Sequence, residues 1–167
     1  MRAYALSHLG RTAEAVSAIE EARKLCDEAQ AWRLDISQAD IYLQCKKMKQ
    51  AEEYFAAALK NSPEKGETLF NIALLYSNAG YDDCAIELLD DVWTLFGTQE
   101  GKFVVPYLAN CFLRNNDMER FLEHLKLAPY CDREATILLF RDRFPGIAPE
   151  DYYAYAYKEI YGVFPKQ

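Results

Sequence analysis

Residues 66–97, GETLFNIALLYSNAGYDDCAIELLDDVWTLFG, decide the fold of this chain. Their apolar spacing predicts two short amphipathic helices separated by a turn at Asn78-Ala79-Gly80. Small residues stand where the helices should cross, Ala73 on the first and Ala85 on the second, and alanine lets two helix axes come close. Such a pair cannot bury its apolar faces alone, so the stretch predicts neighbouring helices of the same kind.

The same pattern recurs along the chain, which is the mark of a repeat protein. The small residue of the first helix returns at spacings of 36, 34 and 36 residues, as Ala3, Ala39, Ala73 and Ala109. A large apolar residue stands three positions later: Leu6, Tyr42, Tyr76 and Phe112. The turn follows seven positions after each alanine, at Gly10, Lys46, Gly80 and Asn116, and glycine and asparagine suit a helix stop because they tolerate positive φ. The second helices repeat as well, at Ala15, Ala51, Ala85 and Phe121, then Ile19, Phe55, Leu89 and Leu125, then Ala22, Ala58, Val92 and Ala128.

This order of small, aromatic, turn and alanine positions resembles the tetratricopeptide repeat, a helix–turn–helix unit of roughly 34 residues. The resemblance is strongest in residues 32–65, which contain AEEYFAAALKNSP, and in residues 66–99. Departures are an Asp35 and a Leu69 in the column of the family's first-helix tryptophan, and Phe121 in place of an alanine. The two longer spacings place extra residues in loops near residues 27–30 and 98–101. The family implies an all-α, right-handed solenoid.

We therefore expect about four helical hairpins, in units 1–31, 32–65, 66–100 and 101–132, followed by capping helices in residues 133–167. In the cap, one helix should cover residues 133–143 and a last helix should follow Pro149 and stop at Gly162. One face of this last helix should pack on the fourth unit, and it comprises Tyr153, Tyr157, Ile160 and Tyr161. Tyr152 and Tyr155 should then be partly exposed, either as a binding surface or as part of a structural cap.

The charge and the absence of long apolar stretches exclude several classes of protein. The net charge is −7, whereas nucleic acid and anionic membrane both attract a basic surface. No apolar stretch approaches the roughly 18 residues of a membrane span. The acidic residues between 82 and 91 are interpreted as a solvated helix face or as a landing site for a basic partner. The partner expected here is a protein or peptide.

The five cysteines favour a reducing compartment. Their odd number and irregular spacing fit no disulfide framework, and no C-x-x-C motif points to zinc. The N-terminal segment is too short and interrupted for a signal-peptide core, so the expected location is the cytoplasm unless a leader has been removed. Because the first helix begins at once with an apolar face, we expect a fragment of a longer solenoid, with possible self-association through the open N-terminal end.

Catalytic and cofactor motifs are missing from the sequence. The two histidines, His8 and His124, fall in different repeats and outside any metal-binding motif. No phosphate-binding glycine loop or nucleophile elbow occurs. We expect neither an enzyme nor a bound cofactor or metal.

The residues with most functional promise lie on the first helix of each hairpin, because stacked hairpins line their concave face with these helices. Asparagine amides could bond the backbone of an extended peptide, and apolar side chains could supply pockets. The candidate groove residues are Arg33, Asp40, Phe70, Asn71, Leu74, Asn78, Tyr107, Asn110 and Arg114. Ile36, Leu43 and Phe103 are predicted on the same surface, and some of the set could instead be core between repeats. One branch of the family holds a C-terminal carboxylate with lysines here, but Ile36, Asp40 and Phe103 occupy those columns.

The first functional hypothesis is a protein–protein interaction scaffold that binds a peptide or helix of a partner in its concave groove. The alternative is an oligomerisation or regulatory module of a larger protein. An accessory segment of an enzyme whose catalytic part lies elsewhere is a third, weaker interpretation.

Overall fold

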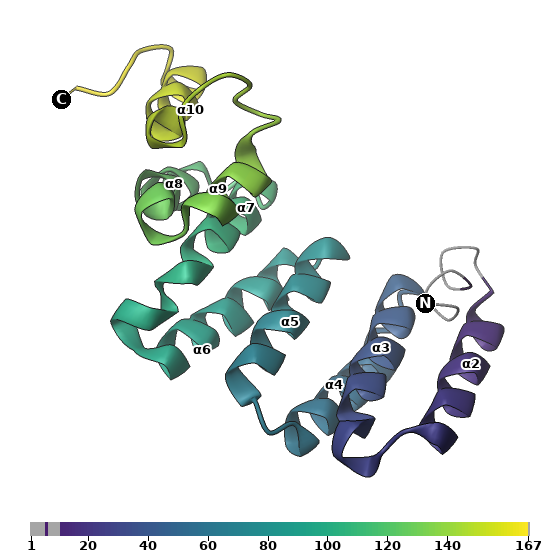
Figure 1. Cartoon of the computed structure of the whole chain (residues 1–167). Coiled ribbons are helices and arrows are strands. Elements are labelled where there is room, and N and C mark those ends of the chain that lie inside the picture. The colour runs from purple at the N-terminus through teal and green to yellow at the C-terminus, as the bar shows by residue number, and fades with distance from the viewer. Residues whose placement is uncertain (1–5, 7–10, 167) are drawn as a thin grey trace. The chain divides into compact units, whose positions relative to one another are not determined.

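The chain is all-α, as the computed structural model in Figure 1 shows. The structure describes residue 6 and residues 11–166, and every regular element within them is a helix. They divide into two compact units, Met1–Gly80 and Tyr81–Gln167, which are described separately. The predicted all-α class of repeated helical hairpins is confirmed.

Among its described residues, the first unit contains four α-helices and one short 3-10 helix. They are α2 (Thr12–Leu25), η1 (Glu28–Gln30), α3 (Ala31–Gln44), α4 (Met48–Asn61) and α5 (Lys65–Asn78). Helix α3 packs along α4 as a hairpin, α2 packs on α3, and α5 contacts both α4 and α3. The first helices of two successive hairpins, α3 and α5, are therefore neighbours, as a tetratricopeptide arrangement requires.

The predicted small columns form the core of this unit. Ala39 and Ala51, on the two helices of one hairpin, are both fully buried, which permits the close approach of α3 and α4. Phe55 of α4 and Tyr76 of α5 bring their ring centroids to 5.2 Å, so the large residues of one repeat fill the space beside the next. Ala22 is an exception, because it is exposed at the end of α2.

The second unit holds five α-helices and two 3-10 helices. They are α6 (Asp82–Glu100), η2 (Gly101–Val104), α7 (Val105–Arg114), α8 (Met118–Cys131), α9 (Arg133–Phe140), η3 (Pro149–Asp151) and α10 (Tyr152–Tyr161). Helices α7 and α8 form the hairpin of this unit, α9 packs on both, and α10 packs on α8. Phe121, which replaces the repeat's alanine, is fully buried, and its ring centroid lies 6.1 Å from that of Phe140 on α9.

The turn column has the backbone that the sequence predicts. Lys46, Gly80 and Asn116 all adopt positive φ, at 59°, 85° and 58°. After α3, the amide of Lys46 donates to Leu43 O and that of Lys47 to Tyr42 O, which is the paired hydrogen bonding of a Schellman helix end. The amides of Asn116 and of the next residue close α7 in the same way. Register along the chain is thus kept by the same turn in each described hairpin.

Two local expectations are wrong. The break expected near residues 98–101 falls earlier, at Gly97, whose non-helical φ of 82° and ψ of 171° suit only glycine and divide α6 into two helical segments; residues 98–100 are helical. The tyrosines of the cap also differ from expectation: Tyr161, expected to pack on the fourth unit, is 54 % exposed, whereas Tyr152, expected to be partly exposed, is 2 % exposed. It begins α10 and stacks on Phe144, with ring centroids 4.9 Å apart.

Candidate functional site

In the first unit, the candidate surface is the exposed side of the neighbouring helices α3 and α5. On α3, Arg33 is exposed and its guanidinium lies 5.1 Å from the centroid of the Trp32 ring. Asp40 is half-buried and its Oδ1 accepts a hydrogen bond of 3.1 Å from Gln44 Nε2. This helix therefore presents one cation and one carboxylate, each with a neighbour on its own helix.

Helix α5 supplies the apolar and amide groups of the same unit. Phe70 and Leu74, one turn apart, are both half-buried, so part of each side chain faces solvent. Asn71 and Asn78 are exposed and lie two turns apart on the same helix face. The arrangement places apolar surface beside amide donors and acceptors, which suits contact with a polypeptide backbone.

The second unit contributes one stripe on α7. Tyr107, Asn110 and Arg114 follow each other at the spacing of a helix face. Tyr107 and Asn110 are half-buried, and burial, with the Asp132 carboxylate adding to it, raises the pKa of the Tyr107 hydroxyl. Tyr107 therefore stays neutral at physiological pH and presents a hydroxyl beside the amide of Asn110.

Arg114 has a structural partner that the sequence did not indicate. Its Nη2 lies 2.9 Å from Oδ1 of Asp82, and its Nε donates to Oδ2 at 3.0 Å. The Asp82 side chain is 7 % exposed and belongs to the first turn of α6, so the ion pair ties α7 to α6. The guanidinium is thus already engaged in an ion pair that includes one charge-assisted hydrogen bond, from Nε to Oδ2.

The nine candidate residues fall into two groups. Those on α3 and α5 share the first unit, and those on α7 share the second. Leu43, which we also expected on this surface, is 1 % exposed and belongs to the core, because its side chain follows the buried face of α3. The expected open N-terminal face falls on residues 1–10, of which the structure describes only Leu6.

Sequence reasoning missed a buried polar contact at the end of α2. Asp35, which replaces the family's tryptophan, is buried and accepts a hydrogen bond of 2.7 Å from Arg23. The same Arg23 nitrogen donates to Gln38 at 3.2 Å. The signal was the charged residue itself, because a lone acid in an apolar column requires a cation nearby.

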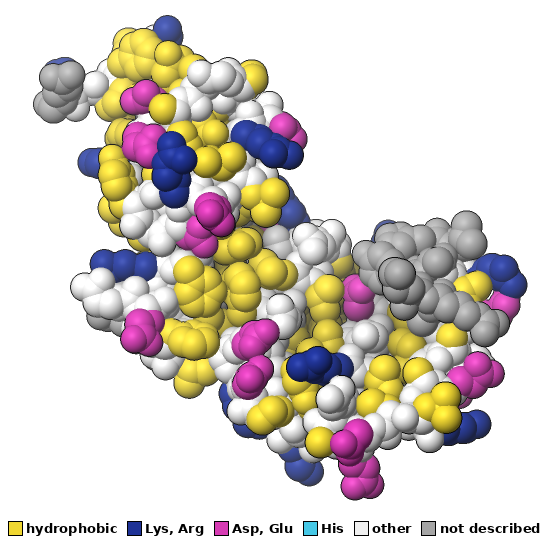
Figure 2. Space-filling view, in the orientation of Figure 1, with side chains coloured by type: hydrophobic (Ala, Val, Ile, Leu, Met, Phe, Trp, Pro, Cys, Tyr) yellow, Lys and Arg dark blue, Asp and Glu magenta, His cyan; other side chains and the backbone are white. Residues whose placement is uncertain are grey.

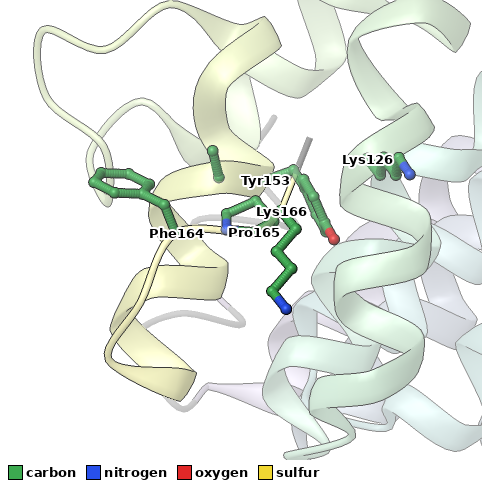
Figure 3. A pocket seen from close by; sticks show the side chains of 6 residues that line it. Lys126, Tyr153, Phe164, Pro165 and Lys166 are labelled. Atoms are coloured by element: carbon green, nitrogen blue, oxygen red, sulfur yellow. The ribbon is translucent and has the colours of Figure 1, made fainter.

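A second missed feature is the surface between α8 and α10. A cavity of about 490 Å³ is lined by Lys126, Tyr153 and the C-terminal residues Phe164–Lys166, as Figure 3 shows. An adjoining cavity of about 280 Å³ shares Lys126 and Tyr153. In Figure 2, hydrophobic side chains gather at the surface around α10, beside acidic and basic ones. The available signal was the recurrence of tyrosines one turn apart on the last helix.

The one histidine among the described residues, His124, makes contacts within its own hairpin. His124 Nδ1 donates to the backbone carbonyl of Arg120 at 2.8 Å, and its ring centroid lies 4.8 Å from that of Phe112. His8 lies outside the described residues. The described part of the chain contains no group of three or more histidine, cysteine, aspartate or glutamate residues that could hold a metal ion.

Comparison with known proteins identifies the repeat. A family model described as Tetratricopeptide repeat matches residues 36–65, which cover most of α3 and all of α4. The resemblance inferred from the sequence is therefore confirmed, and the chain carries a tetratricopeptide repeat in these residues. No curated protein matches the chain.

The class of function follows from the repeat. Tetratricopeptide repeats generally mediate protein–protein interactions, and their family is typically made of non-enzymatic scaffolds. Protein partners are accordingly the expected ligands of this chain. Within the described residues, no helix has the length and apolar character needed to cross a membrane.

Proposed function

We propose that this protein is an interaction scaffold that binds a peptide or a helix of a partner protein on the first helices of its hairpins. Each unit contributes candidate contacts of its own: the exposed sides of α3 and α5 in the first unit, and that of α7 in the second. The observation that carries the proposal is the pairing of half-buried apolar side chains with exposed amides on α5, at Phe70, Leu74, Asn71 and Asn78.

The chemistry of this surface suits a polypeptide ligand. Partly exposed Phe70 and Leu74 bury further apolar area when a partner side chain covers them, at about 25 cal/mol per Å². Asn71 and Asn78 can both donate to and accept from a backbone, which gives register without a fixed partner sequence. Asp40 disfavours an acidic ligand, so the partner segment should be neutral or basic where it passes α3.

Photo-crosslinking tests where the partner binds. The photoreactive residue p-benzoylphenylalanine is placed at Asn71, and as a control at Glu53, which is exposed on the second helix α4. We expect partner adducts from the Asn71 position and few from Glu53, with mass spectrometry identifying the partner. Equal capture from both positions would contradict the assignment of the surface.

The captured partner then permits a binding test. Tyr107→Ala and Asn71→Ala should each weaken binding, and a central aromatic contact is typically worth about 2 kcal/mol or more on truncation. Both variants should keep the helical circular dichroism of the parent, since neither side chain is fully buried. If both bind normally while Tyr155→Ala abolishes binding, the working surface is the C-terminal helix and the proposal fails.

A further inference from the structure

The smaller of the two adjoining cavities between α8 and α10 has lining residues unlike those of the first-helix surface. It measures about 280 Å³, and buried Leu122 forms part of its lining. The rest of the lining is charged or aromatic: Glu119, Glu123 and Lys126 of α8, and Tyr153, Tyr157 and Tyr161 of α10. We propose that this α8–α10 groove is a second binding surface, which takes an arginine or lysine side chain from a basic segment of a partner protein.

The tyrosines form a ladder of aromatic faces. The ring centroids of Tyr153 and Tyr157 are 5.9 Å apart, and those of Tyr157 and Tyr161 are 4.6 Å apart. Cations are attracted to the faces of such rings, within about 6 Å of the centroid. The chain itself provides an example, because Lys126 Nζ lies 5.5 Å from the centroid of the Tyr153 ring. In the described residues, no cation occupies the corresponding position over Tyr157 or Tyr161.

Two unpaired carboxylates face the same cavity. Glu119 and Glu123 lie one turn apart on α8, both are exposed, and neither has an ion-pair partner among the described residues. Three other carboxylates of this unit, Asp117, Glu150 and Glu159, are each paired with an arginine at distances of 2.6–2.9 Å. The groove therefore carries two negative charges against the single positive charge of Lys126.

Charge and volume together select the ligand. An anionic ligand would be repelled by both carboxylates. An apolar helix would remove the carboxylates from water without supplying a cation to pair with them, which costs free energy. The cavity falls at the low end of the roughly 300–1,000 Å³ typical of small-ligand sites, so it suits a single side chain rather than a whole helix. A guanidinium or ammonium group satisfies the carboxylates and the ring faces at once. None of the lining residues belongs to the candidate set on α3, α5 and α7, so the inference does not depend on the proposed function.

The test uses a fluorescein-labelled peptide of alternating alanine and arginine, and the same peptide with citrulline, the neutral isostere, in place of arginine. Fluorescence anisotropy of the full chain should detect binding of the arginine peptide alone. Glu119→Gln combined with Glu123→Gln should weaken that binding about ten-fold. The matched control is Glu52→Gln combined with Glu53→Gln on α4, which removes the same charge from exposed positions and should change affinity less than about two-fold.

The aromatic part of the proposal has its own pair of variants. Tyr157→Phe keeps the ring face and should retain affinity, whereas Tyr157→Leu should weaken binding by roughly three-fold or more. The two substitutions perturb packing at one half-buried position, so comparing them controls for folding. Capture of the partner through Asn71 should persist in the Glu119 and Glu123 variant, which separates this test from that of the proposed function.

Four results would overturn the proposal. They are no detectable binding of the arginine peptide, equal binding of the citrulline peptide, equal loss in the α4 control, and equal affinity of the phenylalanine and leucine variants. Equal loss in the control would mean that the overall charge of −7 attracts the peptide without a site.

Discussion

The ion pair between Arg114 and Asp82 offers the sharpest test of the structure. We predict that Arg114→Ala lowers the stability of the second unit and acts on partner binding only through that loss. The Asp82 side chain is 7 % exposed, its Oδ2 accepts a hydrogen bond of 3.0 Å from Arg114 Nε, and its Oδ1 lies 2.9 Å from Arg114 Nη2. Removing the arginine leaves a carboxylate with little access to water, whose desolvation is then uncompensated.

The expected magnitude lies between two limits. Breaking a fully buried pair costs about 3–5 kcal/mol, and an exposed pair contributes about 0.2–1 kcal/mol. The Arg114 side chain is 36 % exposed, so solvent already screens part of the interaction. Asp82 is also the first residue of α6, where the helix dipole favours its charge by about 0.3–1 kcal/mol after the arginine has gone. We therefore expect a loss of about 2 kcal/mol.

A double-mutant cycle measures this coupling directly. Arg114→Ala, Asp82→Ala and the combined variant are unfolded with urea, and the free energy of unfolding is followed by far-UV circular dichroism. Arg114→Lys should recover part of the loss, because an ammonium keeps the charge but lacks the planar, pre-organised geometry of the guanidinium. The cycle cancels the interaction of Asp82 with the helix dipole, because that interaction does not involve Arg114. We expect a coupling free energy of about 1–2 kcal/mol between the two side chains.

The pair between Arg143 and Glu159 is the control. It has the same distance of 2.9 Å in the same unit, but its side chains are 40 % and 50 % exposed, so its coupling should not exceed about 1 kcal/mol. Equal coupling in the two pairs, or an Arg114→Ala loss within about 0.5 kcal/mol of zero, would refute the reasoning from burial. Arg114 would then be available to a ligand, as we first expected from the sequence.

Three further predictions concern packing and reactivity. Ala85→Leu should cost about 1–3 kcal/mol and lower the melting temperature, because Ala85 is fully buried, whereas Ala56→Leu at an exposed site should not. Gly101→Ala should lower the free energy of unfolding in urea by a similar amount, because the added Cβ would lie 2.7 Å from the backbone oxygen of Trp93. A variant as stable as the parent would show that the backbone shifts to relieve this contact at no cost. Burial, with Asp132 adding to it, raises the pKa of the Cys131 thiol, so its iodoacetamide alkylation should keep accelerating at pH values where a model thiol has reached its plateau.

The repeat could be predicted because its signals are local. Alanine at a crossing and a positive-φ residue at a turn each act within one hairpin, so their spacing in the sequence is preserved in space. Ala39, Ala73 and Ala109 are all fully buried, and Lys46 and Asn116 adopt the backbone that their column requires. The lysine was the less obvious case, since only its position in the column predicted the turn.

The errors arise where the repeat ends or where distant residues meet. Tyr152 was expected to be exposed because its partner, Phe144, precedes it across an irregular segment with no periodicity. Asp35 stood in a column that expects an apolar residue, and its cation, Arg23, comes from the preceding hairpin. The break in α6 falls at Gly97 rather than at residues 98–101, because glycine can adopt the non-helical φ and ψ required there. None of these contacts has a fixed spacing that a single sequence could reveal.

The candidate site was predicted by position and only in part by chemistry. Helical periodicity places Phe70, Asn71 and Leu74 on one helix, and the structure leaves each of them partly or fully accessible. Periodicity cannot say which polar groups already have partners, and Arg114 illustrates this, because Asp82 lies 32 positions away in the sequence. The groove between α8 and α10 was missed for the same reason, since it needs the relative placement of two helices outside one hairpin.

A conflict between stability and recognition explains which residues remain candidates. A side chain held in a buried ion pair must give up that pair to contact a ligand, and the cost of about 2 kcal/mol would cancel the gain of a typical new contact. Arg114 is in that position, and so is Arg23 with Asp35. Half-buried apolar groups and unpaired carboxylates, such as Leu74 and Glu123, carry no such cost and gain burial or charge neutralisation when a partner arrives. We therefore expect this chain to bind a partner through side chains that are not held in buried ion pairs within its own fold.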